Sequence, residues 1–404
     1  MIKQRIEDLS VFGGRSVFDH TLHVGRPNIG NRERLLSRFN DMLDRNWLTN
    51  NGPFVHDFEQ RVAGLLGVKH CIAMCNGTVA LEIAARALNL KGEVIVPSFT
   101  FISTAHCLQW QEITPVFCDV DPETYTIDPA RIEELITPRT TGIIGVHLWG
   151  RTCPVEEIEA IAAKRNLQLL FDASHSFSCS RRGRMVGSFG CAETFSFHAT
   201  KFINTFEGGA VVTNDDVLAE KMRLMKNFGF AGMDNVIYIG TNGKMSEIAA
   251  AMGITSLEEI DRFISINRQN YYTYKGSLEG CPGLKVMTYD EGEKNNYQYV
   301  VLEIDEQGAG ISRDELLRIL HAEGIRARRY FYPGCHNMEP YRSYFPHAGL
   351  LLPVTERLVK RVLCMPTGTE VGKEDIDGIC TLITFIIRHA DGIRARLGSS
   401  GGKR

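Results

Sequence analysis

The 404-residue chain lacks the features that mark several broad classes of protein. It has no polybasic tract and no zinc-finger spacing, and its 45 basic and 48 acidic residues give a formal charge of -3, so no nucleic-acid partner is expected. No run is apolar for long enough to span a membrane, and the N-terminal MIKQRIEDLSVFGG has no apolar core of the kind that signal peptides need. The 11 cysteines contain no CxxC pair and indicate reduced thiols. We expect a cytoplasmic protein with a small-molecule partner, no metal and no membrane.

The order of apolar segments favours an α/β fold. A hydrophobic content of 44% and a charged content of 23% are ordinary for a globular protein. Short apolar runs such as VIVPSF, TPVFCDV, TGIIGVHLW and LQLLFDA alternate with helical patterns such as GTVALEIAARALNL and PVEEIEAIAAKR. This alternation predicts βαβ units and a mainly parallel sheet.

A change of pattern after about Arg262 predicts a second, smaller domain. Long helices are followed there by a mixed segment that contains the run YQYVVLEI. We predict an N-terminal segment and large domain over residues 1–266, a smaller C-terminal domain over 267–398, and a flexible tail over 399–404. The ligand site is expected in the large domain, because ligands of parallel sheets bind beyond the carboxyl ends of the strands.

Lys201 and Asp172 form the most informative pair in the chain. Lys201 lies in TFSFHATKFINTFEGGAVVT, and Asp172, 29 residues upstream, ends the apolar run LQLLFD. A lysine amine can hold the aldehyde of pyridoxal 5'-phosphate (PLP) as a Schiff base, and a carboxylate facing the pyridine nitrogen keeps that ring protonated. Taken singly, the lysine would be a surface charge and the aspartate a turn former or helix cap.

Two further segments lie where a PLP site needs them. HCIAMCNGTVALEIAARAL runs from a strand through Asn76, Gly77 and Thr78 into a helix, whose free N–H groups can hold a phosphate. A plain helix cap is the alternative interpretation. In EVIVPSFTFISTAH, Phe99 or Phe101 could stack on a pyridine ring, although each taken alone is an ordinary core residue.

Together these segments resemble the sugar aminotransferases of the DegT/DnrJ/EryC1/StrS family, which are PLP enzymes of fold type I. The resemblance covers nearly the whole chain, through the motifs LHVGRPNIG, WLTNNGPFVHDFE, NGTVAL, VPSFTF, PVFCDVD, GVHLWG, FDASHSF, SFHATKF, EGGAVVTND, GTNGKMSEIAAAMG, RRYFYPGCHNMEPYR and LPVTERL. So many matches in order are a strong signal, whereas one alone would be weak. The resemblance implies a large domain with a mainly parallel sheet flanked by helices, and a smaller C-terminal α/β domain.

The resemblance also implies roles for individual residues. Lys201 would be the Schiff-base lysine and proton shuttle, and Asp172 the partner of the pyridine nitrogen. His175 falls where the family has Gln or His near the phenolic oxygen of PLP. The other PLP contacts implied are Gly77 and Thr78 in the phosphate loop, the phosphate-binding Ser196, the stacking Phe101, and Asn242, which reaches the phosphate of the neighbouring subunit. A homodimer with shared active sites follows from the last of these.

Two positions depart from the family pattern. The family often has Gly where Phe206 precedes EGG, which leaves the geometry of that loop open. It often has Arg at Lys244, where a planar fork is replaced by a point charge.

The implied reaction transfers an amino group from glutamate or glutamine to a keto-sugar. LHVGRPNIG, RRYFYPGCHNMEPYR and LPVTERLVKRVLCMPTGT look most like enzymes that convert dTDP-4-keto-6-deoxy-D-glucose to dTDP-4-amino-4,6-dideoxy-D-glucose, for an antibiotic or other glycosylated natural product, or a surface polysaccharide. A 3-keto-sugar or cyclitol aminotransferase is an alternative. Relatives that are PLP-dependent sugar dehydratases or non-catalytic regulators provide alternatives of another class.

The substrate contacts implied by the resemblance are the least specific. Trp149, Tyr332 and His336 lie in segments like the sugar-nucleotide loops of the family, and Lys244 could approach a diphosphate. An aromatic residue at a strand end is nearly as often a core residue, and His336 could satisfy a local hydrogen bond.

Overall fold

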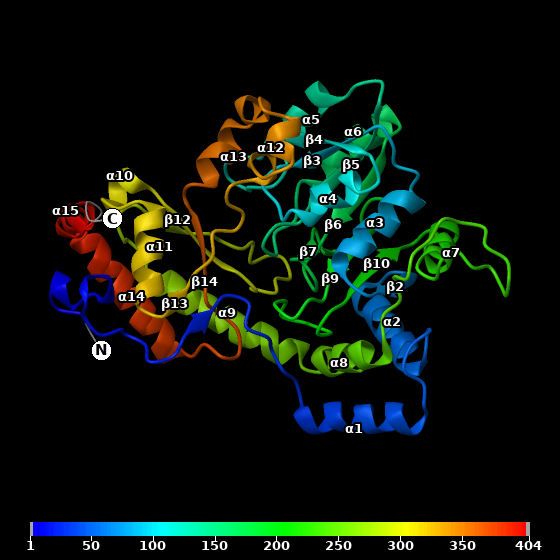
Figure 1. Ribbon diagram of the computed structural model, residues 1–404, viewed down its shortest axis with the longest axis horizontal. Coiled ribbons are helices and arrows are strands. Elements are labelled where there is room, and N and C mark those ends of the chain that lie inside the picture. The colour runs from blue at the N-terminus through cyan, green and yellow to red at the C-terminus, as the bar shows by residue number, and fades with distance from the viewer. Residues whose placement is uncertain (1–2, 401–404) are drawn as a thin grey trace.

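A seven-stranded sheet forms the centre of the large domain in the computed structural model, which describes residues 3–400 (Figure 1). Its order is β2-β10-β9-β6-β5-β3-β4. β10 is antiparallel to β2 and β9, whereas the pairings from β9 through β6, β5 and β3 to β4 are parallel. The strands are β2 (His70–Met74), β3 (Glu93–Pro97), β4 (Thr114–Cys118), β5 (Thr140–Val146), β6 (Gln168–Asp172), β9 (Ala192–Ser196) and β10 (Gly209–Thr213). The predicted mainly parallel α/β sheet is confirmed.

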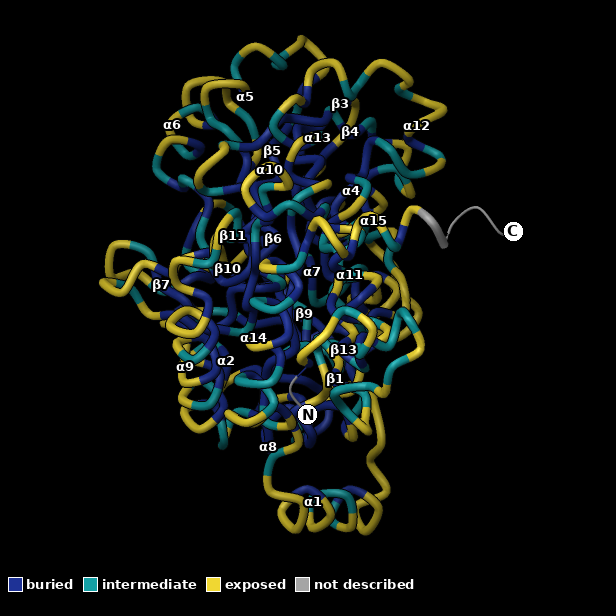
Figure 2. The backbone as a smooth tube through the Cα atoms, turned by 90° about the vertical axis from the view of Figure 1, so that its left-hand side faces the viewer, coloured by how far each residue is buried: buried dark blue, intermediate teal, exposed yellow. Residues whose placement is uncertain are grey.

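Both faces of this sheet are covered, which is why its strands read as continuous apolar runs. In β3, Val94 and Val96 pack with residues of α3, α4 and α7, whereas Ile95 packs on the opposite face with residues of α2, α6 and α8. The central strands are accordingly buried along most of their length, apart from end residues such as Gln168 (Figure 2). The helices of this part are α1 (Arg32–Asp44), α2 (Pro53–Leu66), α3 (Gly77–Ala87), α4 (Ser103–Gln109), α5 (Pro129–Leu135), α6 (Val155–Arg165), α7 (Asp216–Met225) and α8 (Glu247–Leu257).

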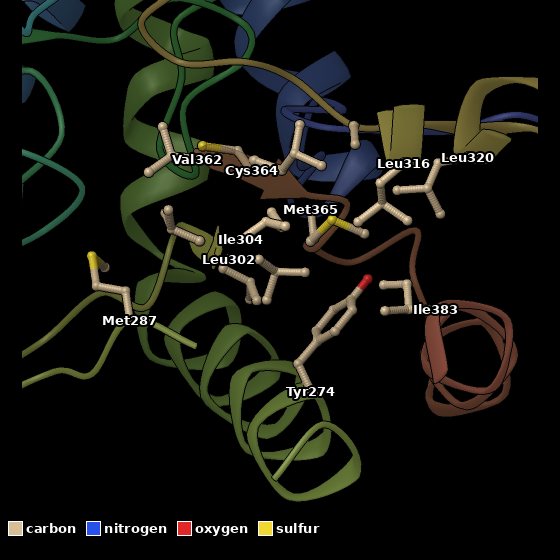
Figure 3. Close-up of a cluster of buried hydrophobic side chains, with 14 of the residues drawn as sticks. Tyr274, Met287, Leu302, Ile304, Leu316, Leu320, Val362, Cys364, Met365 and Ile383 are labelled. Carbon is tan, nitrogen blue, oxygen red and sulfur yellow. The ribbon is translucent and has the colours of Figure 1, made fainter. Parts of the chain in front are cut away.

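The C-terminal part has its own antiparallel sheet, β11-β12-β14. Figure 3 shows its apolar core, in which Leu302 and Ile304 of β12 and Met365 of β14 lie between Tyr274 of α9 and Ile383 of α14. Its elements are α9 (Ile260–Ser277), β11 (Leu284–Val286), β12 (Val300–Ile304), α10 (Glu306–Ala309), α11 (Arg313–Ala322), β13 (Ile325–Arg326), η3 (Cys335–Asn337), α12 (Tyr341–Tyr344), η4 (Ala348–Leu351), α13 (Pro353–Leu358), β14 (Val362–Met365), α14 (Lys373–Arg388) and α15 (Ala390–Ser400).

The N-terminal segment packs against the C-terminal part of the chain. Its elements are η1 (Ile6–Asp8), η2 (Ser10–Phe12) and β1 (Leu22–His23), and β1 pairs in parallel with β13. The Lys3 amine lies 3.0 Å from the Glu323 carboxylate, and both side chains are at most 3% exposed. The prediction grouped this N-terminal segment with the large domain in residues 1–266, whereas its contacts are with the C-terminal part of the chain.

Two other predicted boundaries fall inside helices. The boundary between residues 266 and 267 falls inside α9 rather than in a linker. Ser399 and Ser400 belong to α15, so the tail predicted from residue 399 does not begin there, and residues 401–404 lie outside the described part. A small hairpin joins β7 (Ser180–Arg181) and β8 (Arg184–Met185). In residues 3–400 no helix is both long and apolar enough to cross a bilayer.

Candidate active site

The predicted cofactor residues meet at the carboxyl edge of the parallel strands. Asp172 ends β6 and Ser196 ends β9, while Gly77 begins α3 directly after β2. A cavity of about 430 Å³ lies at this edge. Seven of the eight predicted cofactor contacts line it: Gly77, Thr78, Phe101, Asp172, His175, Ser196 and Lys201.

Lys201 has the electrostatic character of a nucleophilic amine. Burial lowers its pKa from 10.5 to about 8, although the nearby Asp172 charge acts in the opposite direction. A pKa of about 8 leaves roughly one amine in four unprotonated at pH 7.5, against about one in a thousand at 10.5. The turn that carries Lys201 is held by its backbone N–H, which donates to the His198 carbonyl at 2.8 Å.

Asp172 is 5% exposed and receives hydrogen bonds on both carboxylate oxygens. Oδ1 accepts from the Ser174 backbone N–H at 3.1 Å and from the Ser174 hydroxyl at 2.6 Å. Oδ2 accepts from the Thr104 hydroxyl at 2.9 Å. Because these donors stabilise the ionised form, Asp172 is suited to face a cation in the cavity.

An anion cradle lies at the start of α3. The Asn76 side chain caps the Val79 N–H at 2.8 Å, and the first N–H groups of a helix have no intrahelical partner. The Thr78 hydroxyl lies 3.0 Å from the Ser103 hydroxyl, and Ser196 borders the same space. Such a helix start with nearby hydroxyls is suited to a phosphate.

Gly209 permits the close approach of β10 to this cradle. A Cβ added to Gly209 would lie 2.5 Å from the Asn76 carbonyl carbon and 2.6 Å from the Gly77 nitrogen, which are backbone atoms that cannot move aside freely. Only glycine therefore fits at this position without displacing the helix start.

His175 is held as a neutral donor. The Trp149 backbone N–H donates to Nδ1 at 3.3 Å, which leaves the proton on Nε2, and the Phe331 ring stacks on the imidazole at 5.7 Å with an interplanar angle of 10°. Burial and the nearby Lys201 charge hold the pKa of His175 well below its usual value. His175 can donate to an anionic oxygen in the cavity without carrying a charge.

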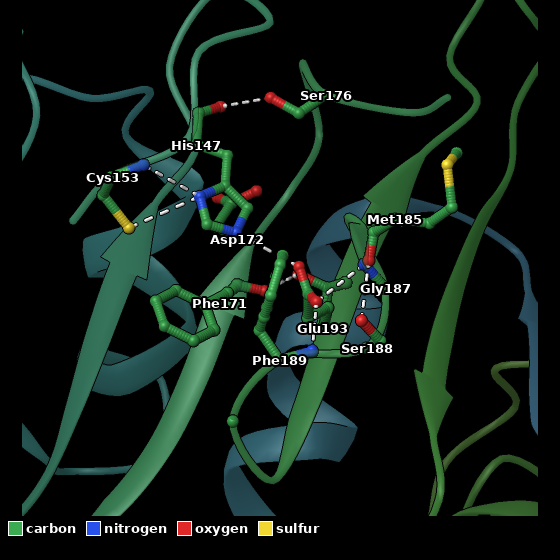
Figure 4. Close-up of polar contacts among 12 residues, drawn as sticks. His147, Cys153, Phe171, Asp172, Ser176, Met185, Gly187, Ser188, Phe189 and Glu193 are labelled. Carbon is green, nitrogen blue, oxygen red and sulfur yellow. Dashed lines mark hydrogen bonds and ion pairs between the residues drawn. The ribbon is translucent and has the colours of Figure 1, made fainter. Parts of the chain in front are cut away.

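A buried polar cluster supports the strand end that carries Asp172 (Figure 4). The His147 N–H donates to the Asp172 carbonyl at 2.9 Å, and the His147 ring lies 3.2 Å from the Glu193 carboxylate. Glu193 also accepts from the N–H groups of Gly187 and Phe189 at 2.6 and 2.7 Å. These hydrogen bonds connect the end of β6, which carries Asp172, to the residue after β5, to β9 and to the turn after β8.

Asn242 and Lys244 do not reach this cavity within the chain. Asn242 is exposed and forms an isolated bridge with Asn227. The Lys244 amine donates to the Asn227 side chain at 3.1 Å and lies 4.7 Å from the centre of the Phe228 ring. Burial and the Lys226 charge lower the pKa of Lys244.

The other three predicted substrate contacts also do not line the cavity. Trp149 is fully buried and packs edge-on against Phe99 at 5.5 Å, which corresponds to the core alternative. His336 is 2% exposed and bonds to the Ser98 hydroxyl and the Glu356 carboxylate, which corresponds to the local hydrogen-bond alternative. Tyr332 is 40% exposed, and the Arg329 guanidinium lies 4.2 Å from the centre of its ring.

Sequence reasoning missed several residues that do line the cavity. Arg328, Tyr330 and Phe331 come from the same RRYFYPG motif as Tyr332. The motif indicates that this segment lies near the active site, but its sequence does not show which of its side chains point into the cavity. The Thr104 donor to Asp172 had no sequence signal beyond its place in VPSFTFIST.

The backbone at Phe206, one of the two departures from the family pattern, has a conformation typical of glycine. Its φ is 63°, in the left-handed region that glycine adopts freely and other residues seldom do. The loop therefore keeps a backbone conformation suited to glycine although phenylalanine occupies the position.

A model of the DegT/DnrJ/EryC1/StrS aminotransferase family matches residues 30–384. The chain belongs to this family. A dTDP-4-amino-4,6-dideoxy-D-glucose transaminase of Escherichia coli is 35% identical over 367 residues, covering 90% of this chain and 98% of the relative. A GDP-perosamine synthase of Caulobacter vibrioides is 35% identical over 377 residues, covering 91% and 98%. The crystal structure of DesI in the presence of its TDP-sugar product has 49% identity and a TM-score of 0.94, covering 97% of this chain and 99% of DesI.

The cavity is consistent with membership in this family, whose aminotransferases depend on PLP. The site fits PLP, because the α3 cradle is shaped for a phosphate and a low-pKa lysine lies with a hydrogen-bonded carboxylate on the same cavity wall. The chain is therefore a PLP-dependent aminotransferase of fold type I, as the sequence resemblance implies.

Proposed function

We propose that this aminotransferase forms dTDP-4-amino-4,6-dideoxy-D-glucose from dTDP-4-keto-6-deoxy-D-glucose. The observation that carries the chemistry is that Lys201 and Asp172 border one cavity together with the α3 cradle. The substrate is supported by the likeness to DesI, whose structure was determined with its TDP-sugar product, and to the E. coli transaminase. The product would serve the biosynthesis of an antibiotic, another glycosylated natural product or a surface polysaccharide in the cytoplasm.

The cavity residues divide the chemistry between them. When bound, PLP supplies an electron sink that makes the proton next to the transferred nitrogen removable. Lys201 would hold the cofactor covalently and could then move that proton, a role suited to an amine whose pKa burial lowers to about 8. Asp172 would keep the pyridine nitrogen protonated, and His175 would donate to the phenolic oxygen.

Arg328 provides a place for the carboxylate of glutamate or glutamine, the donor that we propose. Its side chain lines the cavity and is exposed, with its guanidinium 5.2 Å from the centre of the Tyr330 ring. No hydrogen bond or ion pair joins this guanidinium to another residue within 3–400. A guanidinium can bind a carboxylate through two parallel hydrogen bonds, so an amino acid could dock there beside Lys201.

We further propose a homodimer in which Asn242 completes the active site of the second copy. The helix α1 lies at the periphery of the chain, where it packs against α8 on one side and is otherwise mostly exposed (Figure 2). Large apolar side chains are exposed on α1, the segment after it, the segment after α7 and α8: Leu36, Leu43, Trp47, Leu48, Phe228, Phe230, Val236, Ile237, Ile239 and Ile248. Apolar surface of this extent favours a protein partner, and Asn242 lies within the same region.

The presence of Lys201 in the cavity favours amino transfer over the dehydratase or regulator alternatives. His198, the nearest histidine in sequence, bonds to the Thr200 hydroxyl at 2.8 Å and pairs with Glu207 at 3.4 Å, so it does not replace the lysine. The competing substrates to be tested against the dTDP-4-keto-sugar are a 3-keto-sugar and, because of the likeness to the Caulobacter GDP-perosamine synthase, a GDP-sugar.

The test is to incubate the PLP-loaded protein with glutamate and a panel of 3-keto and 4-keto sugars carrying dTDP or GDP, and to locate the new amine by NMR. We expect amination at C4 of the dTDP sugar. Amination at C3, or turnover of the GDP sugar alone, would contradict the proposed substrate. Borohydride treatment should fix PLP to the Lys201 peptide in mass spectra, and the Lys201→Ala protein is the control.

A further inference from the structure

Two buried threonines form a chain of hydroxyl groups that ends on Asp172. The Thr104 hydroxyl lies 2.9 Å from Asp172 Oδ2, and the Thr100 hydroxyl lies 3.0 Å from that of Thr104. Thr100 is 2% exposed and Thr104 is fully buried. Since an ionised carboxylate only accepts hydrogen bonds, Thr104 donates to Asp172 and Thr100 donates to Thr104.

We propose that Thr104 is a positioning residue that fixes the Asp172 carboxylate for its interaction with the pyridine nitrogen of PLP. The proposal rests on the proposed role of Asp172. Within residues 3–400 no ion pair joins Asp172 to a cation, so hydrogen-bond donors must offset the cost of burying its charge. Each hydroxyl in a chain polarises the next, which strengthens the bond to the carboxylate.

The donors also determine the orientation of the carboxylate. Ser174 donates twice to Oδ1, whereas Thr104 is the side chain that donates to Oδ2. The His147 backbone N–H donates to the backbone carbonyl of Asp172, within the cluster drawn in Figure 4. With the main chain and both oxygens held, rotation of the Asp172 side chain requires that the Thr104 bond break.

Thr104 acts through Asp172 because it does not border the cavity. Thr100, Ser103 and Asp172 line the cavity, whereas Thr104 lies behind them. Ser103, the preceding residue, bonds to Thr78 in the phosphate cradle at 3.0 Å. Two consecutive residues at the start of α4 therefore contact opposite ends of the PLP site. Ser103 contacts the phosphate cradle, whereas Thr104 contacts the carboxylate that would face the pyridine nitrogen.

The test compares holoenzyme carrying Thr104→Val, which keeps the shape and loses the hydroxyl, with Thr104→Ser, which keeps the hydroxyl. Thr213→Val is the matched control, because Thr213 is also buried but lies at the end of β10 remote from Gly209. We expect Thr104→Val to lower kcat about tenfold to a hundredfold with donor KM unchanged, as the loss of a bond to a charged group predicts. The absorption spectrum of bound PLP should also change, because the carboxylate that faces the ring nitrogen is no longer held in place by Thr104.

Thr104→Ser should restore kcat to within about threefold, which is roughly 0.7 kcal/mol, and should restore the spectrum, and Thr213→Val should leave both unchanged. An unchanged spectrum in Thr104→Val, or equal losses in the Val and Ser variants, would overturn the proposal. If the Val variant does not fold, Thr104→Ala replaces it and must show the same change in the spectrum. If Asp172→Asn is itself fully active, the proposed role of Asp172 fails; if Asp172→Asn is impaired and Thr104→Val is not, only the Thr104 proposal fails.

Discussion

The lowered pKa of Lys201 predicts that its amine reacts at a much lower pH than other lysines. In PLP-free protein, we expect half-maximal labelling of Lys201 by a small acylating reagent near pH 8, followed by mass spectrometry of its peptide. The exposed Lys285 serves as the internal reference in the same digest. Because the Asp172 charge acts to raise the pKa of Lys201, Asp172→Asn should move the labelling midpoint further down.

The same pKa predicts how the stability of the PLP-free protein depends on pH. Between about pH 8 and 10.5 the unfolded chain keeps the Lys201 proton while the folded chain has lost it, so stability rises with pH across this window. The full difference corresponds to at most about 3.4 kcal/mol, at about 1.36 kcal/mol per pH unit. Since Lys201 keeps partial solvent contact at the cavity wall, we expect about 2 kcal/mol.

Urea unfolding of wild type and Lys201→Met across this pH range isolates the contribution of this one amine. The wild type should gain stability relative to the methionine variant as the pH rises. A labelling midpoint at or above pH 10, or identical pH dependence in the two proteins, would refute a buried, low-pKa lysine.

Four other experiments test the site. Asp172→Asn should retain PLP but lose several orders of magnitude in kcat, and activity within about threefold of wild type, roughly 0.7 kcal/mol of barrier, would make Asp172 a structural cap only. Gly209→Ala should weaken PLP binding at least about tenfold in titrations of the PLP-free protein, because the added methyl meets backbone at 2.5 Å; unchanged affinity would disprove the tight cradle. Arg328→Gln should raise the KM for glutamate about tenfold or more at similar kcat, and an unchanged KM would place the donor elsewhere. Mixing Lys201→Ala with Asn242→Asp protomers should restore one functional site per mixed dimer, whereas no recovery despite proven subunit exchange would count against shared sites.

The predictable part of the active site came from short segments in which backbone and side chain act locally. Asp172 follows an apolar strand, so its place at the carboxyl edge of a parallel sheet follows from the pattern. Gly77 and Thr78 follow the strand β2 and open the helix α3, which places them in an anion cradle. The chemistry of a lysine with a carboxylate pointed to Lys201 and PLP, and the family motifs added His175 and Ser196.

The unpredicted part depends on side chains that meet across long separations in sequence. Arg328 reaches the cavity from a segment 127 residues after Lys201, and the RRYFYPG letters do not show that Tyr332 turns away while Tyr330 and Phe331 turn inward. Trp149 lies at a strand end, where the pattern allows both the core and the cavity, and packing against Phe99 decides for the core.

The sequence by itself determined the α/β class and the mainly parallel character of the sheet, because strand periodicity and turn residues act over a few residues. Its ordered motifs indicated the family and made Lys201 and Asp172 the candidate pair. Tertiary structure alone decided that Thr104 donates to Asp172 and that Lys3 pairs with Glu323. It also decided that the pKa of Lys201 is lowered. The reason is physical: desolvation and hydrogen-bond partners are properties of the space around a side chain, and packing of distant segments creates that space.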